Sequence, residues 1–165
     1  MKTLLILRHA KSSWDNPDLR DYDRPLNKRG KKDAPRMGKH IKTVKLIPDR
    51  ILTSSAKRAR KTAKRFAKAC GYSGKIKKLD GLYHAPVGIY YETLQAIPDK
   101  YNNIMVVGHN PTMEHLVHHI TGQYHRMPTA ALAHIELPLN NWESLSPNTE
   151  GTLIDLWTPR TLSDD

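Results

Sequence analysis

Short apolar runs alternate with segments of helical periodicity along this chain, and this alternation constrains its fold more than any other feature. The run Lys2–Leu7 is apolar, has no helical period and ends at a charged pair, as is typical of a buried strand in a parallel sheet. Alternating strands and helices predict an α/β three-layer sandwich, in which helices cover both faces of a mostly parallel central sheet. The other expected strands are Asp49–Thr53, Lys75–Leu79, Asn103–Val107, Ala131–Leu137 and Thr152–Trp157.

Four helices are expected between these strands. Asn27 can cap the first, but Pro35 lies within its apolar stripe; because an interior proline costs about 3 kcal/mol, we expect this helix to start late or to kink. Ser54 and Ser55 can cap the second helix, whose exposed face is nearly all basic. Its expected buried stripe is Ala56, Ala59, Ala63, Phe66, Ala67 and Cys70. The other helices are expected at Pro86–Ile97 and Pro111–Ile120, the latter closed by Gly122.

The length of 165 residues fits one domain, expected over residues 1–160, with 161–165 as a disordered tail. The single cysteine, Cys70, cannot form an internal disulfide, which predicts a reducing compartment, the cytoplasm, rather than secretion. No apolar run approaches the roughly 18 residues of a membrane span, so no membrane partner is expected.

The formal net charge of +11 is unevenly distributed and indicates an anionic partner. Residues 1–80 carry 24 basic and 7 acidic side chains, whereas residues 81–165 carry 3 and 9 and hold seven of the nine histidines. Nucleic acid, a phosphoprotein or a phosphorylated metabolite would each fit this charge. Nucleic acid is the least favoured of the three, because Phe66 is the only aromatic residue within the basic run Lys57–Lys68, so stacking on bases is poorly supported.

Three of the predicted strands are followed by residues suited to binding an anion. Arg8 and His9 follow the first strand, Arg58 comes shortly after the second, and His109 follows the fourth. Because ligands of open α/β sheets bind beyond the carboxyl ends of the strands, two arginines and two histidines are expected to meet at one edge. Arginines and a second histidine arranged around a nucleophilic imidazole are suited to phosphoryl transfer.

At these residues the sequence resembles the histidine phosphatase superfamily, which has the phosphoglycerate mutase-like fold, and most closely its SixA-type phosphohistidine phosphatases. The resemblance is carried by Leu7-Arg8-His9-Ala10, the stretch Ser54 to Thr62, Gly108-His109-Asn110-Pro111, Asp23-Arg24-Pro25-Leu26, Leu82-Tyr83 and Met127-Pro128-Thr129-Ala130-Ala131. It implies that His9 accepts the phosphoryl group and that Arg8 and Arg58 bind its oxygens. It also implies that His109 is the second histidine of the phosphate pocket, where it donates a hydrogen bond or carries charge in the transition state.

The sequence departs from the family pattern at two positions and lacks a recognisable general acid. Ala10 stands where many relatives have glycine, and Asp15 stands where many have asparagine, so Asp15 is left outside the expected site. Between Thr62 and Asp99 the only carboxylates are Asp80 and Glu92, and neither lies in an acid motif. A phosphoramidate has imidazole as its leaving group and needs an acid less than an ester does, which favours phosphohistidine as the substrate.

One further histidine group has two interpretations. His115, His118 and His119 have the spacing of metal ligands on one helical face. Solvent-facing histidines are the favoured interpretation, because the glutamate of His-Glu-x-x-His is replaced by Leu116 and the expected chemistry needs neither metal nor cofactor.

The leading hypothesis is therefore a metal-independent phosphatase that forms a covalent phosphohistidine at His9 and acts on phosphohistidine in a signalling protein. A phosphatase of small phosphate esters is the alternative within enzymes, and a basic nucleic-acid-binding module is the alternative of another class.

Overall fold

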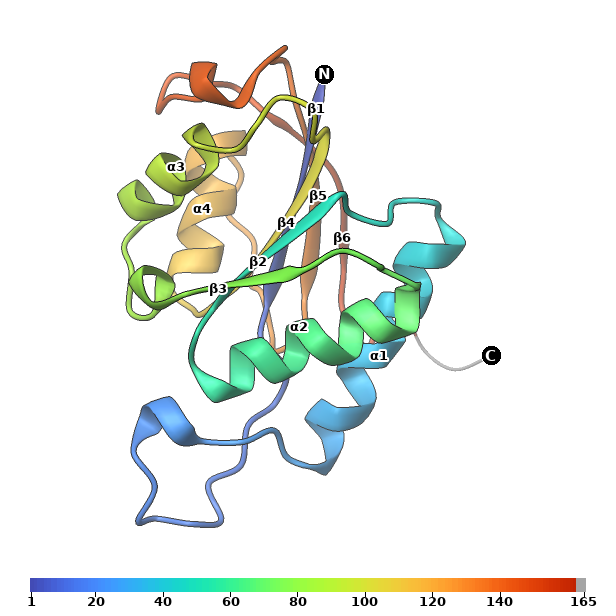
Figure 1. Cartoon of the computed structure of the whole chain (residues 1–165), viewed down its shortest axis with the longest axis vertical. Coiled ribbons are helices and arrows are strands. Elements are labelled where there is room, and N and C mark those ends of the chain that lie inside the picture. The colour runs from blue at the N-terminus through green and yellow to red at the C-terminus, as the bar shows by residue number, and fades with distance from the viewer. Residues whose placement is uncertain (163–165) are drawn as a thin grey trace.

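A computed structural model of the chain describes residues 1–162, which form a six-stranded sheet flanked by helices (Figure 1). The strand order is β3-β2-β4-β1-β5-β6. The strands are β1 (Lys2–Arg8), β2 (Arg50–Ser54), β3 (Ile76–Leu79), β4 (Asn103–Gly108), β5 (Leu132–Leu137) and β6 (Thr152–Trp157). The helices are α1 (Lys28–Thr43), α2 (Lys57–Cys70), α3 (Val87–Gln95) and α4 (Thr112–Thr121).

The sheet is mostly parallel. Strand β1 pairs in parallel with β4, and β2 pairs in parallel with both β3 and β4. On the other side of β1, strand β5 pairs antiparallel with β1, and β6 pairs antiparallel with β5. The predicted α/β sandwich with a mostly parallel central sheet is confirmed.

Helices cover both faces of this sheet, which explains the apolar run of β1. Leu4 and Ile6 pack with residues of α3 and α4, whereas Leu5 and Leu7 pack with residues of α1 and α2. All four side chains are fully buried, because successive residues of a strand point to opposite faces. Figure 1 shows α1 and α2 on one side of the sheet and α3 and α4 on the other.

Two helix starts differ from the predictions. Helix α1 begins directly after Asn27, whose side chain accepts a hydrogen bond from the backbone N–H of Gly30, and it continues through Pro35, so a late start is wrong. Ser54 and Ser55 do not cap α2. The residue at the N-cap is Ala56, because Ser54 belongs to β2 and its hydroxyl faces His109 instead.

The end of the described chain is partly ordered. Thr161 lies in a hydrogen-bonded turn with Thr158, and Leu162 packs against the core cluster beneath α1 and α2. These two residues were expected in a disordered tail, and the rest of that tail, residues 163–165, lies outside the described residues. Within residues 1–162, no helix is long and apolar enough to cross a bilayer.

Candidate active site

The parallel pairing of β1 with β4 brings the two predicted site histidines together. Arg8 is in register with Gly108, and the backbone N–H of His9 donates to the carbonyl oxygen of Gly108 at 3.0 Å. His9 and His109 each follow the end of one of these strands, and their ring centroids are 5.1 Å apart. The two histidines thus share the carboxyl edge of the sheet, where ligands of such folds bind.

The His9 ring is buried, with 7% of the residue exposed, and one of its nitrogens is engaged. Nδ1 lies 2.8 Å from the carbonyl oxygen of Ala10. A carbonyl oxygen only accepts, so Nδ1 carries the hydrogen and the lone pair of the neutral ring lies on Nε2. Burial, together with the nearby charges of His109 and Arg58, lowers the pKa of His9 to about 3. The ring is therefore neutral at pH 7, the state that a nucleophile requires.

His109 is also held neutral and is oriented by Ser54. Its Nε2 lies 2.8 Å from the Ser54 hydroxyl, while Nδ1 is buried without a hydrogen-bond partner among the described residues. Burial, followed by the charge of Arg58, lowers the pKa of His109 to about 4. A bound dianion would offset this desolvation and favour the protonated form.

Both predicted arginines lie at the same edge and act electrostatically on His9. Arg8 donates from Nη1 to the carbonyl oxygen of Met127 at 3.0 Å, and its buried Nε has no hydrogen-bond partner in residues 1–162. Arg58 is 6% exposed and donates from Nη1 to the backbone oxygen of Asp21 at 2.7 Å and from Nη2 to its carboxylate at 2.9 Å. The structure thus brings together all four residues expected from the sequence.

Asp21 is a site residue that sequence reasoning missed. Besides Arg58, its carboxylate accepts hydrogen bonds from Arg24 Nη1 at 3.1 Å and from the Tyr83 hydroxyl at 2.6 Å. Burial opposes its ionisation, but the hydrogen bonds from Tyr83 and Arg58 outweigh burial and hold the pKa of Asp21 well below its usual range. Arg24 and Tyr83 lie in motifs that carried the family resemblance. These two residues were the sequence signal that could have indicated the hydrogen-bond network around Asp21.

Thr62 is a second missed residue, and it ties the loop after β1 to α2. Its hydroxyl accepts from the backbone N–H of Ala10 at 2.9 Å and donates to the backbone oxygen of Arg58 at 2.7 Å. Thr62 is fully buried. The backbone that orients His9 is thereby fixed to the helix that carries Arg58.

The remaining carboxylates considered from the sequence lie on the surface. Asp15 is exposed in the loop after β1, Asp80 is exposed at the start of the short helix Asp80–Leu82, and Glu92 is exposed on α3. The carboxylate in contact with the buried Arg58 is that of Asp21.

A pocket of about 350 Å³ adjoins His109. Its wall includes Tyr90 and Thr112 together with two further histidines, His84 and His115. The pocket leaves space beside His109 for part of a bound molecule.

The three histidines with metal-ligand spacing are all exposed on α4. They are His115, His118 and His119. In residues 1–162, no group of three or more His, Cys, Asp and Glu side chains is arranged to hold a metal ion.

The family model of the histidine phosphatase superfamily, branch 1, matches residues 4–101. The chain belongs to this superfamily. It is 34% identical to an uncharacterized chloroplastic protein of Arabidopsis thaliana, over 86% of this chain and 69% of that protein.

Solved structures place the chain near the SixA type within this superfamily. It is similar to a protein from Agrobacterium tumefaciens provisionally assigned as the phosphohistidine phosphatase SixA, with 30% identity and a TM-score of 0.82 over 96% of this chain and 98% of the other. It is also similar to the protein histidine phosphatase SixA in complex with tungstate, with 25% identity and a TM-score of 0.84 over 98% and 99% of the two chains. The SixA-type resemblance and the phosphoglycerate mutase-like fold are confirmed.

Proposed function

We propose that this protein is a phosphatase that removes the phosphoryl group from phosphohistidine in a protein, through a covalent phosphohistidine at His9. The observation that carries the proposal is the hydrogen bond from His9 Nδ1 to the Ala10 carbonyl oxygen, because it leaves the Nε2 lone pair of a neutral, buried ring for attack.

In the first step His9 Nε2 forms a bond to phosphorus while the bond from phosphorus to the substrate's imidazole nitrogen breaks. The electron pair of the broken bond stays on that nitrogen, and the substrate imidazole leaves as a neutral ring because its other nitrogen carries a proton. Water then attacks the phosphoenzyme, His9 regains its lone pair, and inorganic phosphate leaves with the water's oxygen.

Arg8, Arg58 and His109 would hold the phosphoryl oxygens during both steps. Arg8 Nε and His109 Nδ1 are buried polar atoms without a hydrogen-bond partner in residues 1–162, and each can donate to an oxygen. Each η nitrogen of Arg58 carries two hydrogens, and Asp21 accepts only one of them. Arg58 can therefore hold Asp21 and a phosphoryl oxygen at the same time. The tungstate held by the similar SixA protein has the shape and charge of phosphate, which supports an oxyanion site of this kind.

The experiment is a rapid acid and base quench with a labelled phosphohistidine peptide. We expect a phosphoenzyme that survives base and is lost in acid, and we expect none from His9→Ala. Undiminished turnover by His9→Ala would exclude the proposal.

A phosphatase of small phosphate esters is the second candidate, favoured by the pocket beside His109. Its volume of about 350 Å³ suits a small molecule. Rates on phosphorylated sugars and nucleotides that exceed the rate on phosphohistidine peptides would reverse the order of the two candidates.

A further inference from the structure

The exposed face of α2 carries a stripe of lysines that the chemistry of the site does not use. Lys57, Lys61, Lys64 and Lys68 are spaced by four, three and four residues, so they lie one turn apart along a single face. Arg60 and Arg65 flank the stripe. Ala59, Ala63 and Phe66, which are fully buried, form the opposite face of the helix.

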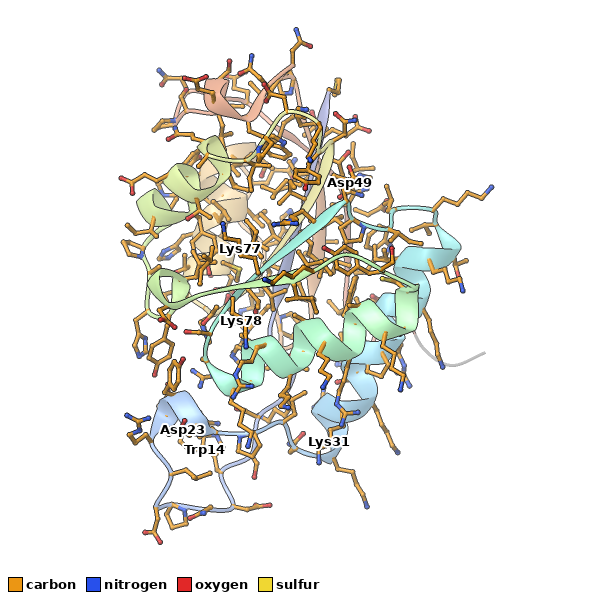
Figure 2. The ribbon with its side chains drawn as sticks, in the orientation of Figure 1. Trp14, Asp23, Lys31, Asp49, Lys77 and Lys78 are labelled. Carbon is orange, nitrogen blue, oxygen red and sulfur yellow. The ribbon has the colours of Figure 1, made fainter. Side chains whose placement is uncertain are left out.

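Strand β3 extends this positive surface at the edge of the sheet. Figure 2 shows Lys78 on the side of β3 that faces α2, with Lys77 on the other side. Between the two elements lies a groove of about 360 Å³. Its lining residues are Arg60, Lys61, Lys64, Gly74, Ile76 and Lys78.

The stretch of sequence that carries this surface supplies no counter-charge. Residues 57–78 contain ten Lys and Arg and no Asp or Glu. Within the described part of the chain, none of the cations on the exposed face of α2 forms an ion pair with a carboxylate. The charge of Lys64, and then slight desolvation, lowers the pKa of Lys61. Like charges one turn apart destabilise a helix, so the stripe costs stability in the free protein.

The stripe begins beside the candidate active site. Lys57 immediately precedes Arg58, and the helix rises about 1.5 Å per residue, so Lys68 lies roughly 15 Å further along the axis than Arg58. A macromolecule with its phosphorylated residue in the site would have its neighbouring surface over these lysines.

We propose that Lys57, Lys61, Lys64 and Lys68, with Arg60 and Lys78, form the docking surface for an acidic face of the phosphorylated protein. This inference rests on the proposed function. Cations spaced one turn apart match carboxylates at the same spacing on a partner helix. A protein is favoured over nucleic acid because, within residues 1–162, this surface offers no free aromatic platform: Phe66 is buried, and the partly buried Tyr72 packs against the core cluster.

The test uses two peptides with the same phosphohistidine, one followed by eight glutamates and the other by eight glutamines. Eight extended residues span about 26 Å, enough to follow the stripe. The variant is the triple exchange Lys61→Glu, Lys64→Glu and Lys68→Glu. The control is Lys31→Glu, Lys39→Glu and Lys42→Glu, which makes the same charge change with three exposed lysines of α1.

For the wild type we expect kcat/KM to be on the order of tenfold higher for the glutamate peptide at low salt, an advantage that disappears at high salt. The α2 variant should lose this preference through KM, while its kcat/KM for the glutamine peptide stays within about twofold of wild type. The control should keep most of the preference. An equal loss in both variants would overturn the proposal, as would an unchanged preference in the α2 variant.

Binding of the unphosphorylated glutamate peptide, measured by fluorescence anisotropy, separates docking from catalysis. If no phosphohistidine peptide is hydrolysed, the proposed function fails, and selective loss of binding in the α2 variant still supports the docking surface. Tighter binding of a single-stranded oligonucleotide of equal charge would overturn the choice of a protein partner. The matching exchanges to glutamine provide a second set if the glutamate variants fold poorly.

Discussion

The carboxylate of Asp21 and the guanidinium of Arg58 form an ion pair of 2.9 Å at the edge of the candidate site. The Asp21 side chain is 42% exposed, whereas that of Arg58 is 8% exposed, so the carboxylate reaches from the surface to a buried cation. Asp21 thus fixes Arg58 in position without a substrate, and it leaves the second hydrogens of the guanidinium to a bound oxyanion.

The first prediction concerns the stability that this ion pair contributes. Asp21→Asn should lower the free energy of unfolding at pH 7 by roughly 1–3 kcal/mol, because Arg58 stays buried without its counter-charge, an effect reduced by the exposure of Asp21. The folded-state pKa of Asp21 is depressed, so this stability is present above the unfolded pKa and is lost as the pH falls through the folded one.

Urea titrations of both proteins at pH 7 and at successively lower pH measure this effect. The free energy of unfolding of wild type should exceed that of Asp21→Asn by the full amount at pH 7, and this difference should shrink below about pH 4. Asp23→Asn is the control, because its pair with Arg20 is exposed and should contribute less than about 1 kcal/mol. If the difference in the free energy of unfolding does not change with pH, the ionised Asp21 carboxylate is not its source.

The second prediction follows from the neutral state of His9. Its pKa is lowered from an ordinary 6.5 to about 3, so the unfolded chain binds a proton at pH 5 that the folded protein does not. Stability is therefore lost as the pH falls from about 6.5 towards the folded pKa. Between pH 7 and 5 this histidine alone should account for roughly 1–2 kcal/mol.

His9→Gln removes this titration, so its stability should fall less between pH 7 and 5 than that of wild type. Urea titrations at the two pH values give the comparison, and His118→Gln, an exposed residue of α4, is the control. If wild type and His9→Gln lose the same free energy of unfolding between pH 7 and 5, then His9 is protonated in the folded protein at pH 5, and the prediction is wrong.

The residues at strand ends, or directly after them, could be predicted from the sequence, whereas those that support them could not. Arg8, His9 and His109 are placed by buried apolar runs that leave little choice of register. Asp21 begins the short 3-10 helix Asp21–Asp23, and nothing in the order of Arg20-Asp21-Tyr22-Asp23 shows which carboxylate turns inward to Arg58.

Ser54 illustrates the same limit. Its type and position suit a helix cap, but the parallel register of β2 with β4 carries its hydroxyl to His109. The capping preference of serine is a local property, whereas the contact between Ser54 and His109 joins residues that are far apart in the chain. Pro35 is a second example. Helix α1 continues past this proline, and its residues Met37 and Ile41 are buried in the core, where tertiary packing stabilises the helix.

The third prediction tests the geometry of Arg58. Arg58→Lys keeps the charge but loses the planar fork, so it cannot hold Asp21 and a phosphoryl group together as arginine can. We expect kcat/KM for a phosphohistidine peptide to fall by about 10²–10³, mainly in kcat, if these contacts strengthen in the transition state. Arg65→Lys at an exposed position of α2 should stay within about twofold. Steady-state kinetics decide, and equal activity of Arg58→Lys and wild type would remove Arg58 from the site.

The fourth prediction concerns Thr62, which joins the backbone N–H of Ala10 to the carbonyl of Arg58. Thr62→Val keeps the volume but leaves the buried N–H of Ala10 without an acceptor, so stability should fall by roughly 1–3 kcal/mol. The carbonyl oxygen of Ala10 also accepts the hydrogen bond that orients His9, so kcat should fall together with the stability.

Thr62→Ser keeps the hydroxyl and should restore most of both losses. Thr93→Val on α3 is the matched control, since the Thr93 hydroxyl only donates to the carbonyl oxygen of Ile89 within its own helix. Urea titration and phosphohistidine kinetics on the three variants separate the two effects. If Thr62→Val lowers stability but leaves kcat unchanged, the Ala10 backbone keeps its position without Thr62, and the orientation of His9 depends on β1 alone.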